Sequence, residues 1–275
     1  MDEVMAPVYE LHSKIDNDRF DRMVEKGKTM AYKTLSDDKI RGDIDKFIQE
    51  WGSDYTFLPS EYDKYVPKRQ AIKPFLQNNI LPDMFGVCGV YPRVVIEMEK
   101  DIGQYANSAY HIKYDDTGKK LNLDLELVLF LTDSACAGRT ATEALSTIAH
   151  ELHHCSQFTD FYDIRMQNRT DFWCVSPSTG RIPQEVIWER SLCSDYPIAR
   201  KQNPTEQEAY TVQGAFKYCL SRYCNADGGG ERKSFVTSLK NPFDESQKDS
   251  IDNIVRNRYN DMIGWDYCPD KIRYR

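Results

Sequence analysis

The chain has 275 residues, 40% of them hydrophobic and 12% aromatic, which is enough to bury a substantial core. Its formal net charge of −7 gives no general attraction for nucleic acid or for an anionic membrane surface, so we expect neither as a partner. The first residues do not combine a basic segment with an apolar run, and no stretch reaches about 18 apolar residues. We therefore expect a globular protein that is cytoplasmic or otherwise intracellular.

Residues 1–80 form a charged region with a helical pattern. Apolar residues recur there at helical spacing, for example Phe20, Met23, Ile40, Ile44 and Phe47. Several prolines interrupt the pattern, and no catalytic constellation is present. We expect a helical N-terminal region that caps the next domain or offers a surface to a partner.

From Met84 the pattern changes to short β-like runs. Residues 94–98 and 110–114 are two such runs, and residues 115–118 read as the loop of a hairpin. In residues 121–131 every second residue is leucine, which defines one buried face of a strand. The sequence therefore predicts an α+β fold whose antiparallel or mixed sheet packs one face on the helix that follows.

The sequence marks where that helix begins and which of its sides is buried. Thr140 and Glu143 have the spacing of a capping box. An apolar stripe follows at helical spacing, made of Leu145, Ile148, Ala149, Leu152 and Cys155. The stripe predicts that one side of the helix faces the core, whereas the adjoining side lines a cleft.

The same helix carries His-Glu-x-x-His at residues 150–154. His150 and His154 lie about one turn apart on a helix, where two imidazoles can bind a single metal ion. Glu151 is suited to act as a general base on water polarised by that ion. We expect His153 to be a surface residue or to support the site from outside the ligand set, with ligation as an alternative. The non-functional alternative is a helix on which these histidines face solvent and bind no metal ion.

A third ligand is expected, and a downstream helix offers two glutamates. Glu208 shares a helix face with apolar residues such as Val212 and Ala215, whereas Glu206 falls where a capping box with Asn203 would place its carboxylate. We therefore favour Glu208 as the inward-pointing ligand and Glu206 as a capping residue.

Asp160 is the alternative third ligand. No histidine follows His154, so a downstream third histidine is excluded. Asp160 stands ten residues after His150, as the third ligand does in H-E-x-x-H-x-x-G-x-x-His/Asp sites, but Gln157 replaces the glycine of that pattern.

The remaining chain divides into three parts. Residues 161–202, between the two motif helices, read as an irregular insertion that walls the cleft. The run Gly228-Gly229-Gly230 reads as a flexible turn rather than a phosphate loop, and a last helix is expected over residues 244–263. The eight cysteines form no C-x-x-C pair, so we expect free thiols and no second zinc site of ribbon type.

The segments Ala149-His150-Glu151-Leu152-His153-His154-Cys155-Ser156-Gln157 and Asn203-Pro204-Thr205-Glu206-Gln207-Glu208-Ala209 together resemble the minimal gluzincins. These zinc peptidase-like domains carry AHEL.H..Q on one helix and NP.E.EA on the next, and the similarity covers roughly residues 85–225. The resemblance implies a zincin-like core over residues 81–225, flanked by the N-terminal region and by a helical C-terminal extension over residues 226–275. It also implies that the strand before the motif helix holds an extended peptide. The segment between the two motif helices is unusually long for that family.

The sequence as a whole predicts a metallopeptidase with one Zn²⁺ ion. The resemblance assigns the ion to His150, His154 and Glu208 and the role of general base to Glu151, and the substrate would be a peptide or protein. Two alternatives stay open: an inactive or regulatory zinc-binding module that acts through protein partners, and another amide or ester hydrolase on the same scaffold.

Overall fold

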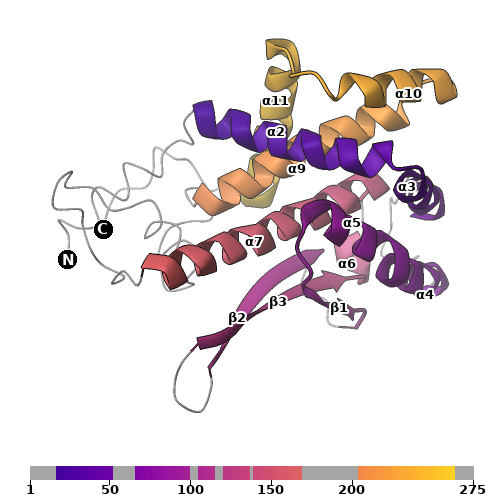
Figure 1. The fold of residues 1–275 in the computed structure, drawn as a ribbon. Helices are drawn as coiled ribbons and strands as arrows, with labels where there is room; N and C mark the ends of the chain where they lie inside the picture. Colours follow the sequence, from indigo (N-terminus) through magenta and orange to yellow (C-terminus); the bar gives the residue numbers. More distant parts are fainter. Residues whose placement is uncertain are drawn as a thin grey trace.

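The computed structural model describes residues 17–51, 66–99, 105–114, 120–136, 139–168 and 204–263. Helices dominate these ranges, and three strands form one small sheet (Figure 1). The elements in chain order are α2 (Asn17–Ser36), α3 (Asp38–Trp51), α4 (Val66–Phe75), the π-helix η2 (Leu76–Ile80), α5 (Leu81–Cys88), β1 (Arg93–Glu97), β2 (Ala106–Tyr114), β3 (Lys120–Phe130), α6 (Asp133–Cys136), α7 (Ala141–Asn168), α9 (Pro204–Cys224), α10 (Gly228–Ser238) and α11 (Glu245–Ile263). The α+β prediction is confirmed at this level.

The sheet is mixed and has the strand order β1-β3-β2. β3 pairs with β2 in the antiparallel direction and with β1 in the parallel direction. The predicted leucine face is confirmed where side chains are described, because Leu127, Leu129 and Leu131 are fully buried. That face packs on α7, which covers β2 and β3 (Figure 1). The predicted hairpin loop over residues 115–118 lies outside the described residues.

The capping box at the start of α7 is confirmed. The backbone N–H of Thr140 donates to Glu143 Oε2, and the backbone N–H of Glu143 donates to Thr140 Oγ1, both at 3.2 Å. The predicted apolar stripe is also buried. The predicted irregular segment, however, begins later than expected, since α7 continues without a break to Asn168. The rest of the insertion lies outside the described residues.

Helix α9 lies between three other helices. It contacts α7 on one side, α2 on another and α11 on a third, and Figure 1 shows it layered between α2 and α7. Gly27 of α2 permits this close packing, because a Cβ atom there would lie 2.5 Å from the backbone oxygen of Val212 and 2.7 Å from Ala215 Cβ. Every residue from Glu208 to Phe216 is consequently buried.

The N-terminal helices share the core of the motif helix. Ile44, Phe47 and Trp51 of α3 belong to the same buried cluster as the apolar stripe of α7. The indole N–H of Trp51 donates to the backbone oxygen of Arg139, just before α7, at 3.0 Å. The N-terminal region therefore helps to hold the start of the motif helix.

The C-terminal part of the described chain forms two helices, one of which differs from the prediction. The glycine run was predicted as a turn, but Gly228, Gly229 and Gly230 form the first turn of α10, and Gly228 enters it with φ of 86°. The predicted last helix is confirmed as α11, which packs on α9. Among the described helices, none combines the length and the apolar character that crossing a bilayer requires.

Candidate metal centre

Helix α7 places the two motif histidines side by side. His150 and His154 are separated by one helical turn, both are buried, and their Nε2 atoms lie 3.1 Å apart. Their rings meet edge to face with centroids 4.7 Å apart. The predicted juxtaposition of the two imidazoles is therefore present.

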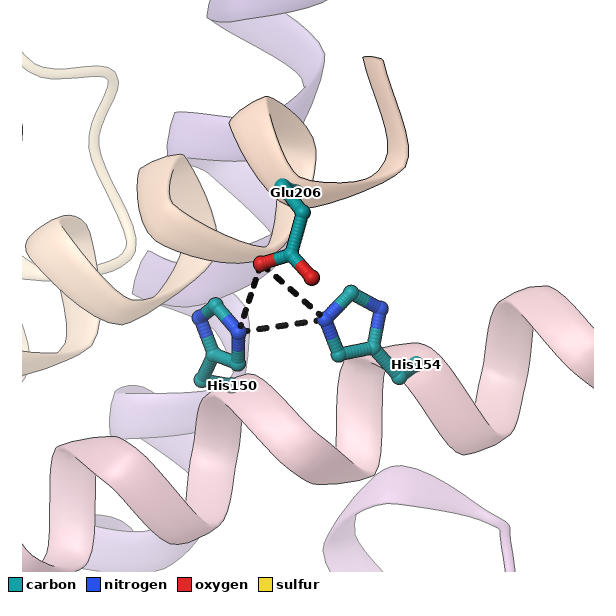
Figure 2. A group of neighbouring side chains, drawn as sticks. All are labelled: His150, His154 and Glu206. Carbon is teal, nitrogen blue, oxygen red and sulfur yellow. Dashed lines mark hydrogen bonds and ion pairs between the residues drawn. The ribbon is translucent and has the colours of Figure 1, made fainter. Parts of the chain in front are cut away.

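Glu206 of α9 brings its carboxylate to this pair. Its Oε2 lies 3.5 Å from His150 Nε2 and 3.7 Å from His154 Nε2, and Figure 2 shows the three side chains converging from the two helices. Burial alone would raise the pKa of Glu206, but its contacts with the two histidines outweigh burial and hold that pKa well below its usual range. Burial alone would lower the pKa of His154, and the carboxylates of Glu206 and Glu151 instead raise it to about 9. The cluster thus has the charge distribution of a cation site.

The geometry of the three side chains suits a metal ion. Two ligand atoms bound about 2.0–2.1 Å from a tetrahedral zinc ion lie about 3.3–3.4 Å apart. The three separations between His150 Nε2, His154 Nε2 and Glu206 Oε2 span 3.1–3.7 Å, so small side-chain movements would equalise them. One carboxylate oxygen and two imidazole nitrogens also match the donors of catalytic zinc sites. Among the described residues, His150, His154 and Glu206 form a group that could hold a metal ion.

Glu208 does not occupy the position expected from the sequence. Its carboxylate faces α2 and the far side of α7, where it accepts a hydrogen bond from Gln157 Nε2 at 2.8 Å and pairs with Arg19. Burial would raise the pKa of Glu208, but its contacts with His153 and the Arg19 guanidinium lower it to about 2. Glu206, expected to cap α9, occupies the position near the histidines instead, whereas its expected capping partner Asn203 lies outside the described residues.

The reason for this difference is the rotation of α9 relative to α7. The apolar stripe with Val212 and Ala215 faces α2, not α7. The polar stripe faces α7: the Tyr210 ring lies 4.5 Å from the His150 ring, Gln213 Nε2 donates to Thr147 Oγ1 at 3.4 Å, and Lys217 Nζ donates to Glu143 Oε1 at 2.9 Å. Glu206 belongs to this second stripe. The apolar stripe of α9 is buried, as predicted. Burial, however, does not show which side of α9 meets the histidines of α7.

The alternative ligand Asp160 lies away from the centre. It follows His154 by six residues on the unbroken helix α7, about 9 Å further along the axis at 1.5 Å per residue, and it is exposed. The glycine that would turn the chain back is replaced by Gln157, and the helix continues through this position. The structure therefore does not bring Asp160 to the two histidines.

Gln157 contacts His154 and Glu208, a role that the spacing of the two motif histidines does not predict. Its Oε1 lies 2.8 Å from His154 Nδ1, and its Nε2 donates to Glu208. A bound metal ion would displace the proton from His154 Nε2, and the contact with Gln157 would keep the other proton on Nδ1, which orients Nε2 toward Glu206 and His150. The i,i+3 spacing of His154 and Gln157 on one helix is the signal from which this contact could have been predicted.

His153 is buried rather than on the surface. Its Nε2 lies 3.8 Å from Glu208 Oε2, beyond hydrogen-bond distance, and burial lowers its pKa to about 3. His153 is therefore a neutral imidazole on the side of α7 that faces α2 and α5, outside the group formed with Glu206.

Glu151 lies against the sheet. Ser108 of β2 donates from its hydroxyl to Glu151 Oε2 at 2.7 Å, and the Glu151 side chain is buried. This contact also changes the expectation about peptide binding. β3, the strand before the motif helix, is paired with both β1 and β2 over Glu126–Leu129, so it cannot accept another strand there. β2 is the edge strand that lies beside Glu151.

Comparisons of the chain with models of protein families, with curated proteins and with solved structures gave no match. The function of the centre is therefore inferred from its geometry and chemistry.

Proposed function

We propose that the protein is a zinc-dependent peptidase with a zincin-like core, in which His150, His154 and Glu206 bind the ion and Glu151 is the general base. The observation that carries this proposal is the convergence of Glu206 on both histidines, with Glu151 adjoining them on α7. Glu206 replaces Glu208 in the ligand set expected from the sequence. A base beside the metal favours catalysis over a regulatory zinc module, because a structural site has no use for it.

The ion would supply Lewis acidity, lowering the pKa of water and polarising a carbonyl oxygen. Glu151 provides the proton transfers. Its Oε2 accepts the Ser108 hydrogen bond, which fixes the carboxylate and leaves Oε1 to take a proton from water. The protonated carboxyl group then returns this proton to the leaving amine. Burial of Glu151 excludes bulk water that would otherwise compete for this proton.

The edge strand β2 supports the proposal of a peptide substrate. Among the described strands, β1 and β2 each pair on one side only, and β2 is the one that carries Ser108 next to Glu151. An extended peptide can add to such an edge through its backbone hydrogen bonds. This arrangement would align a scissile bond along β2, beside the base. We therefore propose an extended peptide segment as the substrate, rather than an isolated amide or ester.

The test combines metal analysis with cleavage of a peptide library by the wild type and by Glu151→Gln. We expect one zinc ion per chain in both proteins and a loss of cleavage rate of about 10²–10⁴-fold in the variant, because the amide cannot accept the proton. Glu99→Gln, a change at an exposed glutamate after β1, is the matched control and should cleave like the wild type. Equal cleavage by wild type and Glu151→Gln would refute the mechanism, whereas bound zinc without any cleavage would support the binding module.

A further inference from the structure

A cavity lies on the side of α7 that carries Leu152, His153 and Ser156. It has a volume of about 480 Å³ and is bounded by α2, α5, α7 and α9. This volume is within the range of about 300–1,000 Å³ found for small-molecule sites. His153 lines it, whereas His150, His154 and Glu206 do not. The cavity is therefore separate from the candidate metal centre.

The floor of the cavity is apolar but contains one buried polar ring. Leu152, Val212 and Met30 form buried parts of it. His153 is 4% exposed, and neither of its ring nitrogens has a partner within hydrogen-bond distance, since the Glu208 carboxylate lies 3.8 Å from Nε2. A buried imidazole without a partner costs free energy unless another group satisfies it. A ligand with a hydrogen-bonding end would supply that group.

The rim of the cavity is positively charged. Arg22, Lys26 and Lys33 line it together with a single acid, Glu25, which is already paired with Lys28 at 2.7 Å. Lys26 Nζ donates to Ser156 Oγ at 3.1 Å, so its ammonium group is held at the cavity wall. An ammonium group has three donors, and this bond uses one of them. Desolvation lowers the pKa of Lys26, and the nearby carboxylates of Asp160 and Glu208 offset only part of that effect. The carboxylate of a bound ligand would stabilise the charged ammonium group further.

We propose that this cavity binds a small amphipathic carboxylate, whose hydrocarbon chain lies on the floor and whose carboxylate contacts Lys26. An apolar floor with a cationic rim is complementary to both parts of such a molecule. The N–H of neutral His153 would be a second donor to the bound molecule. A neutral ligand would leave the rim charges uncompensated, and a simple inorganic anion would leave the floor unfilled. This second site goes beyond the proposed peptidase function and does not depend on it.

Titration calorimetry with sodium octanoate tests the proposal, with zinc-loaded and metal-depleted protein. We expect saturable 1:1 binding in both forms, and at least about tenfold weaker binding of the neutral analogue 1-octanol. Lys26→Met, which keeps an unbranched side chain but removes the ammonium group, should weaken octanoate binding about tenfold. Lys233→Met on α10, a change at an exposed lysine, is the matched control and should bind like the wild type.

A second variant tests the location without removing a charge. Thr29 lines the cavity from the exposed face of α2, so Thr29→Trp should fill it and abolish binding while the protein stays folded by circular dichroism. The proposal is overturned if octanoate does not saturate the folded wild type, or if Thr29→Trp binds it normally. Binding that disappears on metal removal would also overturn it, because the carboxylate would then be a ligand of the metal ion.

Discussion

Glu206 and Glu208 are only two residues apart on α9, yet their carboxylates belong to different networks. Two residues correspond to about 200° around a helix, so the side chains point to nearly opposite sides. Glu206 meets the histidines of α7, whereas Glu208 meets Gln157 and Arg19. One glutamate can therefore bind a metal ion while the other orients the residues behind it.

Isosteric substitution should separate these two roles. Glu206→Gln removes the charged ligand, and we expect zinc affinity to fall by more than the roughly 10–100-fold typical of residues that support a ligand from behind. Glu208→Gln should stay within that range, since its amide still accepts a hydrogen bond from Gln157. Competition with a chelator at fixed pH measures both affinities. A larger loss in Glu208→Gln than in Glu206→Gln would restore Glu208 as the ligand.

Gln157 is a positioning residue for His154. Gln157→Leu removes the partner of His154 Nδ1, so the ring can rotate and either nitrogen can carry the proton. We expect zinc affinity to fall about 10–100-fold. Thr159→Ala on the same helix is the control, because the Thr159 hydroxyl donates to the backbone of its own helix and does not contact the centre. Unchanged affinity in Gln157→Leu would show that packing alone orients His154.

The packing of α9 on α2 requires close approach at Gly27. Gly27→Ala would place Cβ 2.5 Å from the Val212 backbone oxygen and 2.7 Å from Ala215 Cβ, so α2 and α9 would have to separate. We expect the free energy of unfolding to fall by about 1–3 kcal/mol, as for other overpacked sites. Because Arg19 of α2 contacts Glu208, zinc affinity should fall as well.

Gly42 provides the matched control for this substitution. It lies within α3, and a Cβ atom there meets nothing within 4 Å. Gly42→Ala should therefore stabilise the protein by about 0.5–1 kcal/mol, through a lower conformational entropy of the unfolded chain. Urea unfolding measures both variants. Equal effects of the two substitutions would contradict the close packing of α2 on α9.

The candidate metal centre joins parts of the molecule that are far apart in the chain. His150 and His154 belong to α7, and Glu206 to α9, so an ion held by all three binds the folded state and not the separated helices.

At a zinc concentration 100-fold above the Kd of the centre, zinc binding should add about 2.7 kcal/mol to the free energy of unfolding. Thermal melts with zinc, with chelator and with Mg²⁺ measure this effect. We expect Tm to rise with zinc only, because imidazole ligands suit zinc better than Mg²⁺.

His154→Ala is the control for the melts and should abolish the zinc response. If zinc raises the Tm of His154→Ala as much as that of the wild type, the ion binds elsewhere in the chain. If zinc leaves the wild-type Tm unchanged, the centre does not hold the ion.

Short-range patterns in the sequence were enough to predict several parts of this molecule. The period-two leucines defined the buried face of β3, and the i,i+3 pair of Thr140 and Glu143 defined the start of α7. The i,i+4 spacing placed His150 and His154 together. Each of these features depends on the geometry of a single element, so no knowledge of its neighbours is needed.

The tertiary structure alone decided which acid meets the histidines and where the cavity lined by Lys26 and His153 lies. α9 is buried on all sides over Glu208–Phe216, so burial gives no information about which side faces α7. In the observed rotation, Val212 and Ala215 approach Gly27 of α2, and Glu206 approaches the histidines of α7. The cavity likewise forms where four helices meet. These features depend on how elements pack, and the periodicity of one helix does not specify the orientation of its neighbours.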